Sequence, residues 1–182
     1  MERSTIIAGF GGQGVKLAGT VLSEAAGLRD GLWATQRGEY GSATRGGPST
    51  VDVVLGSDPI TYPAADHPDV LVLLTQAAAD RYGRSVKAGG RVIADPAEVK
   101  RPPEGALAVP VAAIAREHAG KPIAAGMVAL GCVAACADAV SLDALRETIG
   151  AHVPGTAVAG NVKACVAGYE ATRAALRGGV HA

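Results

Sequence analysis

A short apolar run that breaks into glycines near the N-terminus constrains the fold of this chain more than any other feature. Residues 4–15 read Ser-Thr-Ile-Ile-Ala-Gly-Phe-Gly-Gly-Gln-Gly-Val, with four glycines within six residues. The pattern predicts a buried strand over Thr5–Ala8 that stops at the glycines and is followed directly by a helix from Val15. Such a turn exposes backbone N–H groups at the helix N-terminus, where a phosphate or the backbone of another chain can approach closely.

The composition predicts a single domain over residues 1–182 with a core of small aliphatic side chains. Hydrophobic residues make up 48% of the chain but aromatic residues only 3%, which suits helices packed tightly on a sheet. Seventeen basic residues balance 17 acidic ones, so no net field attracts nucleic acid or an anionic membrane. Too few apolar residues precede the glycines for a signal peptide, and we expect a cytoplasmic protein.

The three cysteines, Cys132, Cys136 and Cys165, are predicted to be small buried hydrophobic residues. An odd number of cysteines without a secretion signal fits a reducing compartment. The spacing from Cys132 to Cys136 is one helical turn rather than a metal knuckle, so we expect no iron–sulfur cluster in this chain. The uncharged stretch 123–137 is too short for a bilayer span and predicts a buried core helix. Gly126 and Gly131 would allow close backbone approach along it.

Strands and helices alternate over the first two thirds of the chain, and the last third is helical. Further strands are predicted over 49–55, 69–74, 91–94 and 107–109, and helices over 15–29, 77–85 and from 110 to 120. The region 32–40 is a poor strand, and 36–48 is a polar, glycine-rich connection. Helices are predicted over 123–138, 142–149 and 158–176. This order indicates an α/β fold: a three-layer α/β/α arrangement with a mostly parallel sheet and a helical C-terminal third.

The spacing of Gly9, Gly11 and Gly14 also satisfies the G-x-G-x-x-G fingerprint of dinucleotide-binding domains. Such a domain places an acidic residue about 20 residues further on, at the end of its second strand, to hold the ribose. Here the only acid in the corresponding region is Glu39, in a loop-like setting. A stand-alone Rossmann-like oxidoreductase that binds NAD(P) or a flavin is therefore an alternative that the sequence does not favour.

A second glycine-rich segment runs from Tyr40 to Ser49 and includes Arg45, Gly46 and Gly47. An arginine in such a loop can present a planar guanidinium to a carboxylate or a phosphate. Tyr40 and Arg45 are unusual choices for a plain connection, which favours a functional loop.

Together these segments resemble the gamma subunit of 2-oxoacid:ferredoxin oxidoreductases, the family of the pyruvate, 2-oxoglutarate, branched-chain 2-oxoacid, indolepyruvate and phenylglyoxylate enzymes. The resemblance rests on Gly9–Gly14, Tyr40-Gly41, Arg45-Gly46-Gly47 and Pro68–Val72, and extends from residue 4 to about 170 through 89–93, 127–131 and 161–164. Two departures are visible. Ser42-Ala43 stands where the family often has Pro-Glu, and Gly126 lies near the place of a frequent asparagine.

The resemblance implies a subunit of a multisubunit enzyme that is not active alone. The complex would decarboxylate a 2-oxoacid oxidatively to an acyl-CoA, with ferredoxin, or NAD through a flavoprotein, as the final acceptor. Thiamine diphosphate, Mg²⁺, [4Fe–4S] clusters and coenzyme A would be held mainly by the alpha, beta and ferredoxin-like delta subunits, and none by this chain alone. A purely scaffolding role for the subunit is the other alternative.

The resemblance also implies which residues of this chain approach a cofactor or a neighbouring subunit: Gly9, Gly11, Gly12, Gln13, Gly14, Tyr40, Gly41, Arg45, Gly46 and Gly47. We expect both loops to emerge on one side of the sheet. No catalytic or metal-binding constellation is predicted: His67 falls in a turn, His118 near a helix end, and His152 and His181 in a loop or the tail. Asp52 is predicted on the polar face of a strand.

Overall fold

The computed structural model describes residues 2–40, 47–137 and 139–178. Its strands are β1 (Glu2–Phe10), β2 (Trp33–Tyr40), β3 (Pro48–Gly56), β4 (Val70–Leu73), β5 (Arg91–Ala94) and β6 (Leu107–Ala108). Its helices are α1 (Val15–Glu24), α2 (Gln76–Tyr82), α3 (Val111–Ala119), α4 (Ala125–Ala137), α5 (Leu142–His152) and α6 (Gly155–Gly178). A π-helical turn, η1 (Ala25–Arg29), extends α1, and a 3₁₀ turn, η2 (Pro122–Ala124), leads into α4.

The strands form one six-stranded sheet in the order β2-β3-β1-β4-β5-β6. Strands β1, β4, β5 and β6 pair in parallel, whereas β3 pairs antiparallel with both β1 and β2. The connection from β2 to β3 is too short for a crossover, which forces an antiparallel pair. The predicted mostly parallel α/β fold is therefore confirmed, with an antiparallel strand inserted beside β1.

The prediction for residues 32–40 was wrong, because Trp33–Tyr40 forms a complete edge strand. It pairs with β3 from Trp33 opposite Gly56 to Tyr40 opposite Ser49. An ion pair of 2.9 Å between Arg37 and Asp52 joins the two strands, and Asp52 is buried beneath it. Since most side chains of β2 stay exposed or half-buried, the strand carries no apolar pattern, and its conformation comes from its pairing with β3.

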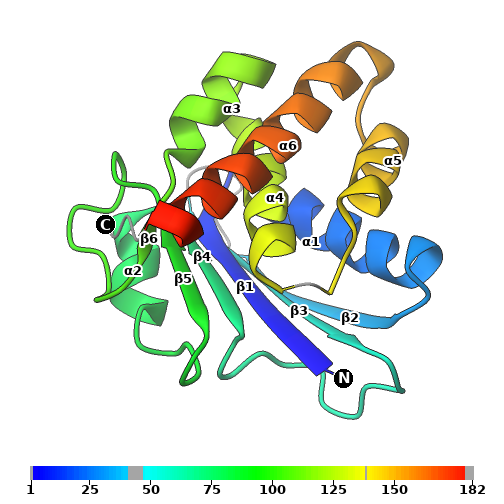
Figure 1. Ribbon diagram of the computed structural model, residues 1–182, viewed down its shortest axis with the longest axis horizontal. Coiled ribbons are helices and arrows are strands. Elements are labelled where there is room, and N and C mark those ends of the chain that lie inside the picture. Colours follow the sequence, from blue (N-terminus) through cyan, green and yellow to red (C-terminus); the bar gives the residue numbers. More distant parts are fainter. Residues whose placement is uncertain (1, 41–46, 138, 179–182) are drawn as a thin grey trace.

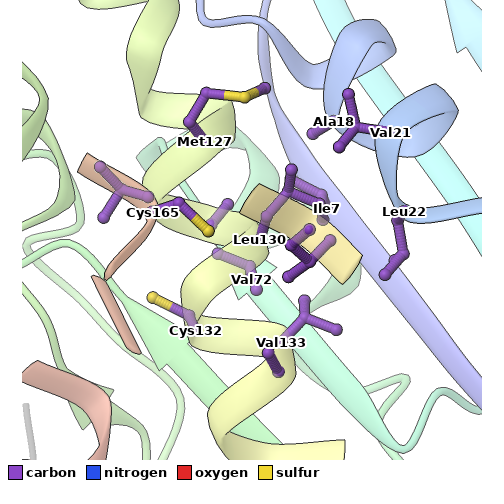
Figure 2. Close-up of a cluster of buried hydrophobic side chains, with 14 of the residues drawn as sticks. Ile7, Ala18, Val21, Leu22, Val72, Met127, Leu130, Cys132, Val133 and Cys165 are labelled. Atoms are coloured by element: carbon purple, nitrogen blue, oxygen red, sulfur yellow. The ribbon is translucent and has the colours of Figure 1, made fainter. Parts of the chain in front are cut away.

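Helices cover the two faces of the sheet unevenly (Figure 1). On one face, α1, α3, α4, α5 and α6 pack over Ile7, Val72 and their neighbours to form the larger core, part of which Figure 2 shows. On the other face, Ile6, Leu71 and Leu73 pack against α2 and the loop around Val99. Helix α4 lies within the larger core and is buried along nearly its whole length.

Helix α4 packs in the chain's own core, as predicted, and its Gly131 lies against α6. A Cβ atom at Gly131 would overlap the backbone of Cys165 and Tyr169 in α6, and a Cβ atom at Gly168 of α6 would overlap the backbone of Val128. Within the described residues no single helix is both long and apolar enough to cross a membrane. Helix α3 taken together with Pro122–Ala137, with a bend of 119° between them, would be long and apolar enough, by length and composition only.

Candidate functional site

The glycine loop after β1 and Gly47, from the second glycine-rich segment, lie together at one edge of the sheet, where β1 ends and β3 begins. The Phe10–Gly14 loop leaves the carboxyl end of β1, and Gly47 lies immediately before the adjacent strand β3. The N–H group of Gly11 donates a hydrogen bond of 2.8 Å to the carbonyl oxygen of Gly47. Tyr40 ends β2 at the same edge, while Gly41, Arg45 and Gly46 lie outside the described residues.

Hydrogen bonds from Gln13 fix the shape of the glycine loop. Its Oε1 accepts the Phe10 N–H at 2.7 Å, and its own N–H donates to the Phe10 carbonyl at 3.2 Å. Its Nε2 lies 3.5 Å from the carbonyl oxygen of Leu74, at the end of β4. A Cβ atom at Gly9 would overlap this amide, so the glycine at position 9 makes room for Gln13.

The start of α4 closes against the same loop. Gly14 has a φ of 76°, and a Cβ atom there would overlap the carbonyl oxygen of Ile123. The N–H of Gly126 donates 2.8 Å to the carbonyl of Gln13, and a Cβ at Gly126 would overlap the carbonyl of Gly14. Glycine at 126 is therefore required by the contact between α4 and the glycine loop.

A hollow of about 640 Å³ lies at this edge, and we refer to it as the glycine-loop hollow. Its lining comes from the loop, α1, the start of β3, η2 and α5: residues 10–12, 14–17, 20, 47–49, 123 and 152. Two apolar side chains at the hollow stay accessible, since Phe10 is 36% exposed and Ile123 is 50% exposed. At Gly12, with a φ of 99°, no atom lies within 4 Å of a Cβ position.

His152 was wrongly predicted to lie in a loop, because α5 continues to this residue. Its Nε2 lies 2.7 Å from Glu24 Oε2, so the side chain joins the end of α5 to the end of α1 beside the hollow. No local sequence signal connects Ile123 or His152 with the glycine loop, since both are more than 100 residues away from it along the chain.

The geometry differs from that of a dinucleotide-binding domain. In that fold the strand carrying the ribose acid lies next to β1. Here β3 separates β2 from β1, and Glu39, within β2 rather than in a loop, forms an ion pair of 2.6 Å with Arg81 of α2. The Gly11 N–H, which the fingerprint would offer to a pyrophosphate, donates instead to Gly47.

The cysteines have structural positions in the core. Cys132 and Cys165 are fully buried, and this burial raises the pKa of each thiol to about 12. Cys136 is half-buried. Among residues 2–40, 47–137 and 139–178, no group of three or more His, Cys, Asp and Glu side chains is placed to hold a metal ion.

In this α/β fold the glycine loop contacts Gly47, immediately before β3, and the start of α4 within the same chain. The chain belongs to the pyruvate ferredoxin/flavodoxin oxidoreductase family, whose profile matches residues 4–171. Within this family it is a gamma subunit of a 2-oxoacid:ferredoxin oxidoreductase, as the following similarities show.

The 2-oxoglutarate synthase subunit KorC of Methanothermobacter marburgensis is 38% identical over 179 residues, which cover 93% of this chain and 96% of the relative. The crystal structure of the keto/oxoacid ferredoxin oxidoreductase gamma subunit of Geobacter sulfurreducens superposes with a TM-score of 0.86 at 34% identity, covering 96% of this chain and 98% of that one. The 2-oxoglutarate:ferredoxin oxidoreductase of Magnetococcus marinus, solved with 2-oxoglutarate, coenzyme A and succinyl-CoA, shares the fold (TM-score 0.82, 23% identity) over 95% of this chain and 31% of that one.

Proposed function

We propose that this gamma subunit contributes the glycine-loop hollow to the active-site region of a thiamine diphosphate-dependent 2-oxoacid oxidoreductase, on the side from which coenzyme A approaches. The observation that carries the proposal is the hollow itself, where the two predicted loops are joined by the Gly11–Gly47 hydrogen bond. The proposal includes ten residues of these loops: Gly9, Gly11, Gly12, Gln13, Gly14, Tyr40, Gly41, Arg45, Gly46 and Gly47.

The lining of the hollow suits a long ligand with an apolar arm and phosphate groups, such as coenzyme A. Phe10, Leu17, Pro48 and Ile123 offer apolar surface to the arm. Lys16 lies in the first turn of α1, where an ammonium group and the positive end of the helix dipole both favour an anion. Few polar groups on an otherwise apolar lining are typical of small-molecule sites.

The hard chemistry of the reaction belongs to groups that the partner subunits hold in this proposal. Thiamine diphosphate with Mg²⁺ would supply decarboxylation of the 2-oxoacid, and [4Fe–4S] clusters would carry single electrons to the acceptor. The two fully buried thiols of this chain are packed among core side chains, which does not fit a cluster site. The gamma subunit orients the acyl acceptor, excludes water from one wall of the site, and contacts the alpha, beta and delta subunits.

A pair of matched variants tests the role of the hollow in the assembled enzyme. Ile123→Glu places a carboxylate at the hollow, whereas Leu28→Glu makes the same change at an aliphatic residue that is 77% exposed and does not line it. Repulsion between the introduced carboxylate and the phosphates of coenzyme A should raise the KM for coenzyme A about tenfold in Ile123→Glu, equivalent to about 1.4 kcal/mol. The KM for the 2-oxoacid should change less than about twofold.

The measurement is acceptor reduction at saturating 2-oxoacid with varied coenzyme A. Equal coenzyme A kinetics in the two variants and in the wild type would overturn the proposed position of the hollow. Arg45→Ala tests the connection between β2 and β3 in the same assay, where coenzyme A kinetics equal to those of the wild type would count against a role of Arg45 in the site.

The partner subunits and the substrate are identified by purification through a tag on this chain. We expect alpha, beta and ferredoxin-like delta subunits to co-purify and the complex to oxidise at least one member of a panel of 2-oxoacids with coenzyme A. If a complex lacking this chain turns over with an unchanged KM for coenzyme A, the subunit does not contribute to that site.

A further inference from the structure

We infer that Gln13 is a positioning residue, which holds the glycine loop in the shape that forms the hollow without contacting the ligand there. The inference rests on the proposed function of the hollow and adds a role that the glycine motif alone does not assign. Neither Gln13 nor Gly9 belongs to the lining of the hollow, although their neighbours Phe10, Gly11, Gly12 and Gly14 do.

Gln13 connects three segments that are distant in the sequence. Its side-chain amide joins the Phe10 N–H at the end of β1 to the Leu74 carbonyl at the end of β4. Its backbone carbonyl accepts the Gly126 N–H at the start of α4. The loop between β1 and α1 is thereby tied to both the central sheet and the most deeply buried helix.

The chemistry of the side chain explains why glutamine suits the position. The amide accepts a hydrogen bond from Phe10 through Oε1 and donates to Leu74 through Nε2, so it meets one partner of each kind. A carboxylate at this position would still accept from Phe10 but would face the Leu74 carbonyl with a second acceptor. An asparagine at this position has one methylene group fewer, so its amide would reach less far toward Phe10 and Leu74.

Gly9 completes the arrangement, because the space of its missing Cβ atom is occupied by Gln13 Oε1. Packing within the chain thus accounts for both Gly9 and Gln13 in the glycine motif, because the first leaves the space that the second fills. The glycines of the motif that line the hollow are Gly11, Gly12 and Gly14.

The test uses the assembled enzyme with Gln13→Ala, Gln13→Glu or Gly9→Ala in the gamma subunit. Each variant removes or displaces the amide, so the loop loses its fixed shape. We expect the KM for coenzyme A to rise about tenfold while kcat at saturating coenzyme A changes less than about twofold. Gln13→Glu should resemble Gln13→Ala rather than the wild type, because it cannot donate to Leu74.

Gln76→Ala is the matched control, because the Gln76 side chain likewise holds a loop by accepting backbone N–H groups, but outside the hollow. Its Oε1 accepts the N–H groups of Lys100 at 2.8 Å and Arg101 at 2.9 Å. This variant should leave the KM for coenzyme A unchanged even where it lowers the melting temperature. A parallel loss of kcat and stability in the Gln13 variants, with an unchanged KM, would overturn the positioning role.

Comparison with Ile123→Glu separates this inference from the proposed function. If Ile123→Glu raises the KM for coenzyme A and all three loop variants leave it unchanged, the hollow stands and the role of Gln13 is wrong. If neither kind of variant changes it, the proposed function is wrong and the inference fails with it. A raised KM in both kinds of variant supports both statements. Where Gln13→Ala fails to assemble, the nearly isosteric Gln13→Glu provides the same comparison.

Discussion

At Gly9 the amide of Gln13 occupies the space that a Cβ atom would need, and at Gly14 that space holds the carbonyl oxygen of Ile123. Gly12 differs from both, because no atom lies within 4 Å of its Cβ position and only its φ of 99° favours glycine there. A glycine motif that resembles a phosphate-binding fingerprint thus contains residues selected by packing within the chain. Spacing alone does not separate these two reasons for glycine.

Burial does not set the pKa of Asp69, at the amino end of β4, because the partners of its carboxyl outweigh it. Asp69 accepts hydrogen bonds from Ser4, 2.8 Å from the backbone nitrogen and 3.2 Å from Oγ, and it forms an ion pair with Lys87. Burial by itself raises the pKa of this carboxyl, but the bonds from Lys87 and Ser4 outweigh burial and lower it. A folded-state pKa below the unfolded one stabilises the fold at neutral pH, and this contribution is lost as the pH falls through the lowered pKa.

We therefore predict that Asp69→Asn lowers the free energy of unfolding by about 1–2 kcal/mol at neutral pH. The difference from the wild type should shrink as the pH falls below about 4, because the carboxyl of the unfolded chain becomes protonated first and that of the folded chain follows at its lowered pKa. Denaturant unfolding of the isolated chain at several pH values measures both quantities. A difference that stays constant down to about pH 3 would contradict the assigned cause.

At the scale of elements, α4 and α6 approach each other through glycines on both helices. Gly131 faces the backbone of Cys165, and Gly168 faces the backbone of Val128. Cys132 also takes part in this contact, since its Sγ lies 3.8 Å from the Gly168 carbonyl oxygen, whereas Figure 2 shows Leu130 on the side of α4 that faces Ile7. Because backbone meets backbone, neither helix can accommodate even one extra methyl group without shifting.

Gly131→Ala should destabilise the chain by about 2–4 kcal/mol, because α4 must move away from α6. Gly150→Ala is the control within α5, where the nearest atom to a Cβ position lies at 3.8 Å. Its higher helix propensity should leave the free energy of unfolding unchanged or raise it by up to about 1 kcal/mol. Thermal and denaturant unfolding of the two variants measure the contrast, and equal destabilisation would show that the helix contact is looser than described.

The same helices bury two thiols, Cys132 and Cys165, which we expect to be unreactive in the folded chain. Burial raises the pKa of Cys132 and Cys165 to about 12, so both stay protonated at about pH 8, where thiol reagents require a thiolate. We expect both to resist an aromatic disulfide reagent in the folded chain and to react once it is unfolded. Mass spectrometry after timed labelling locates the modified residues. Labelling of Cys165 in the folded chain at the rate of a free thiol would contradict its burial.

At the scale of the whole molecule, we expect the sheet to be most stable at its centre. Strand β1 lies between two hydrogen-bonded neighbours and beneath the larger core, whereas β2 and β6 are the edges. Backbone amides open locally with free energies that follow burial and pairing. In hydrogen exchange on the isolated chain, residues 6–8 and 71–73 should therefore be protected longest and residues 33–39 lose protection first. Equal protection of β2 and β4 would contradict this order and would mean that the β2 edge of the sheet is covered.

The sequence predicted those elements whose signals are local. The apolar run of β4, the β-branched residues of β3 and the end of α3 at Gly120, with a φ of 67°, were all located correctly. Ser141 caps α5, with its Oγ accepting the Ala144 N–H at 3.1 Å. Strand β2 was missed because its exposed side chains carry no pattern, and His152 was misplaced because α5 runs three residues past the predicted end.

The amino-acid sequence by itself determined the α/β class, the two glycine-rich loops and the resemblance to gamma subunits, since each depends on residues close together in the chain. Only the tertiary structure decided that β3 separates β2 from β1, that Ile123 and His152 line the hollow, and that Gln13 occupies the space beside Gly9. The physical reason is that strand order and close backbone approach depend on contacts between distant segments. A local pattern specifies which element forms but not which neighbour it meets.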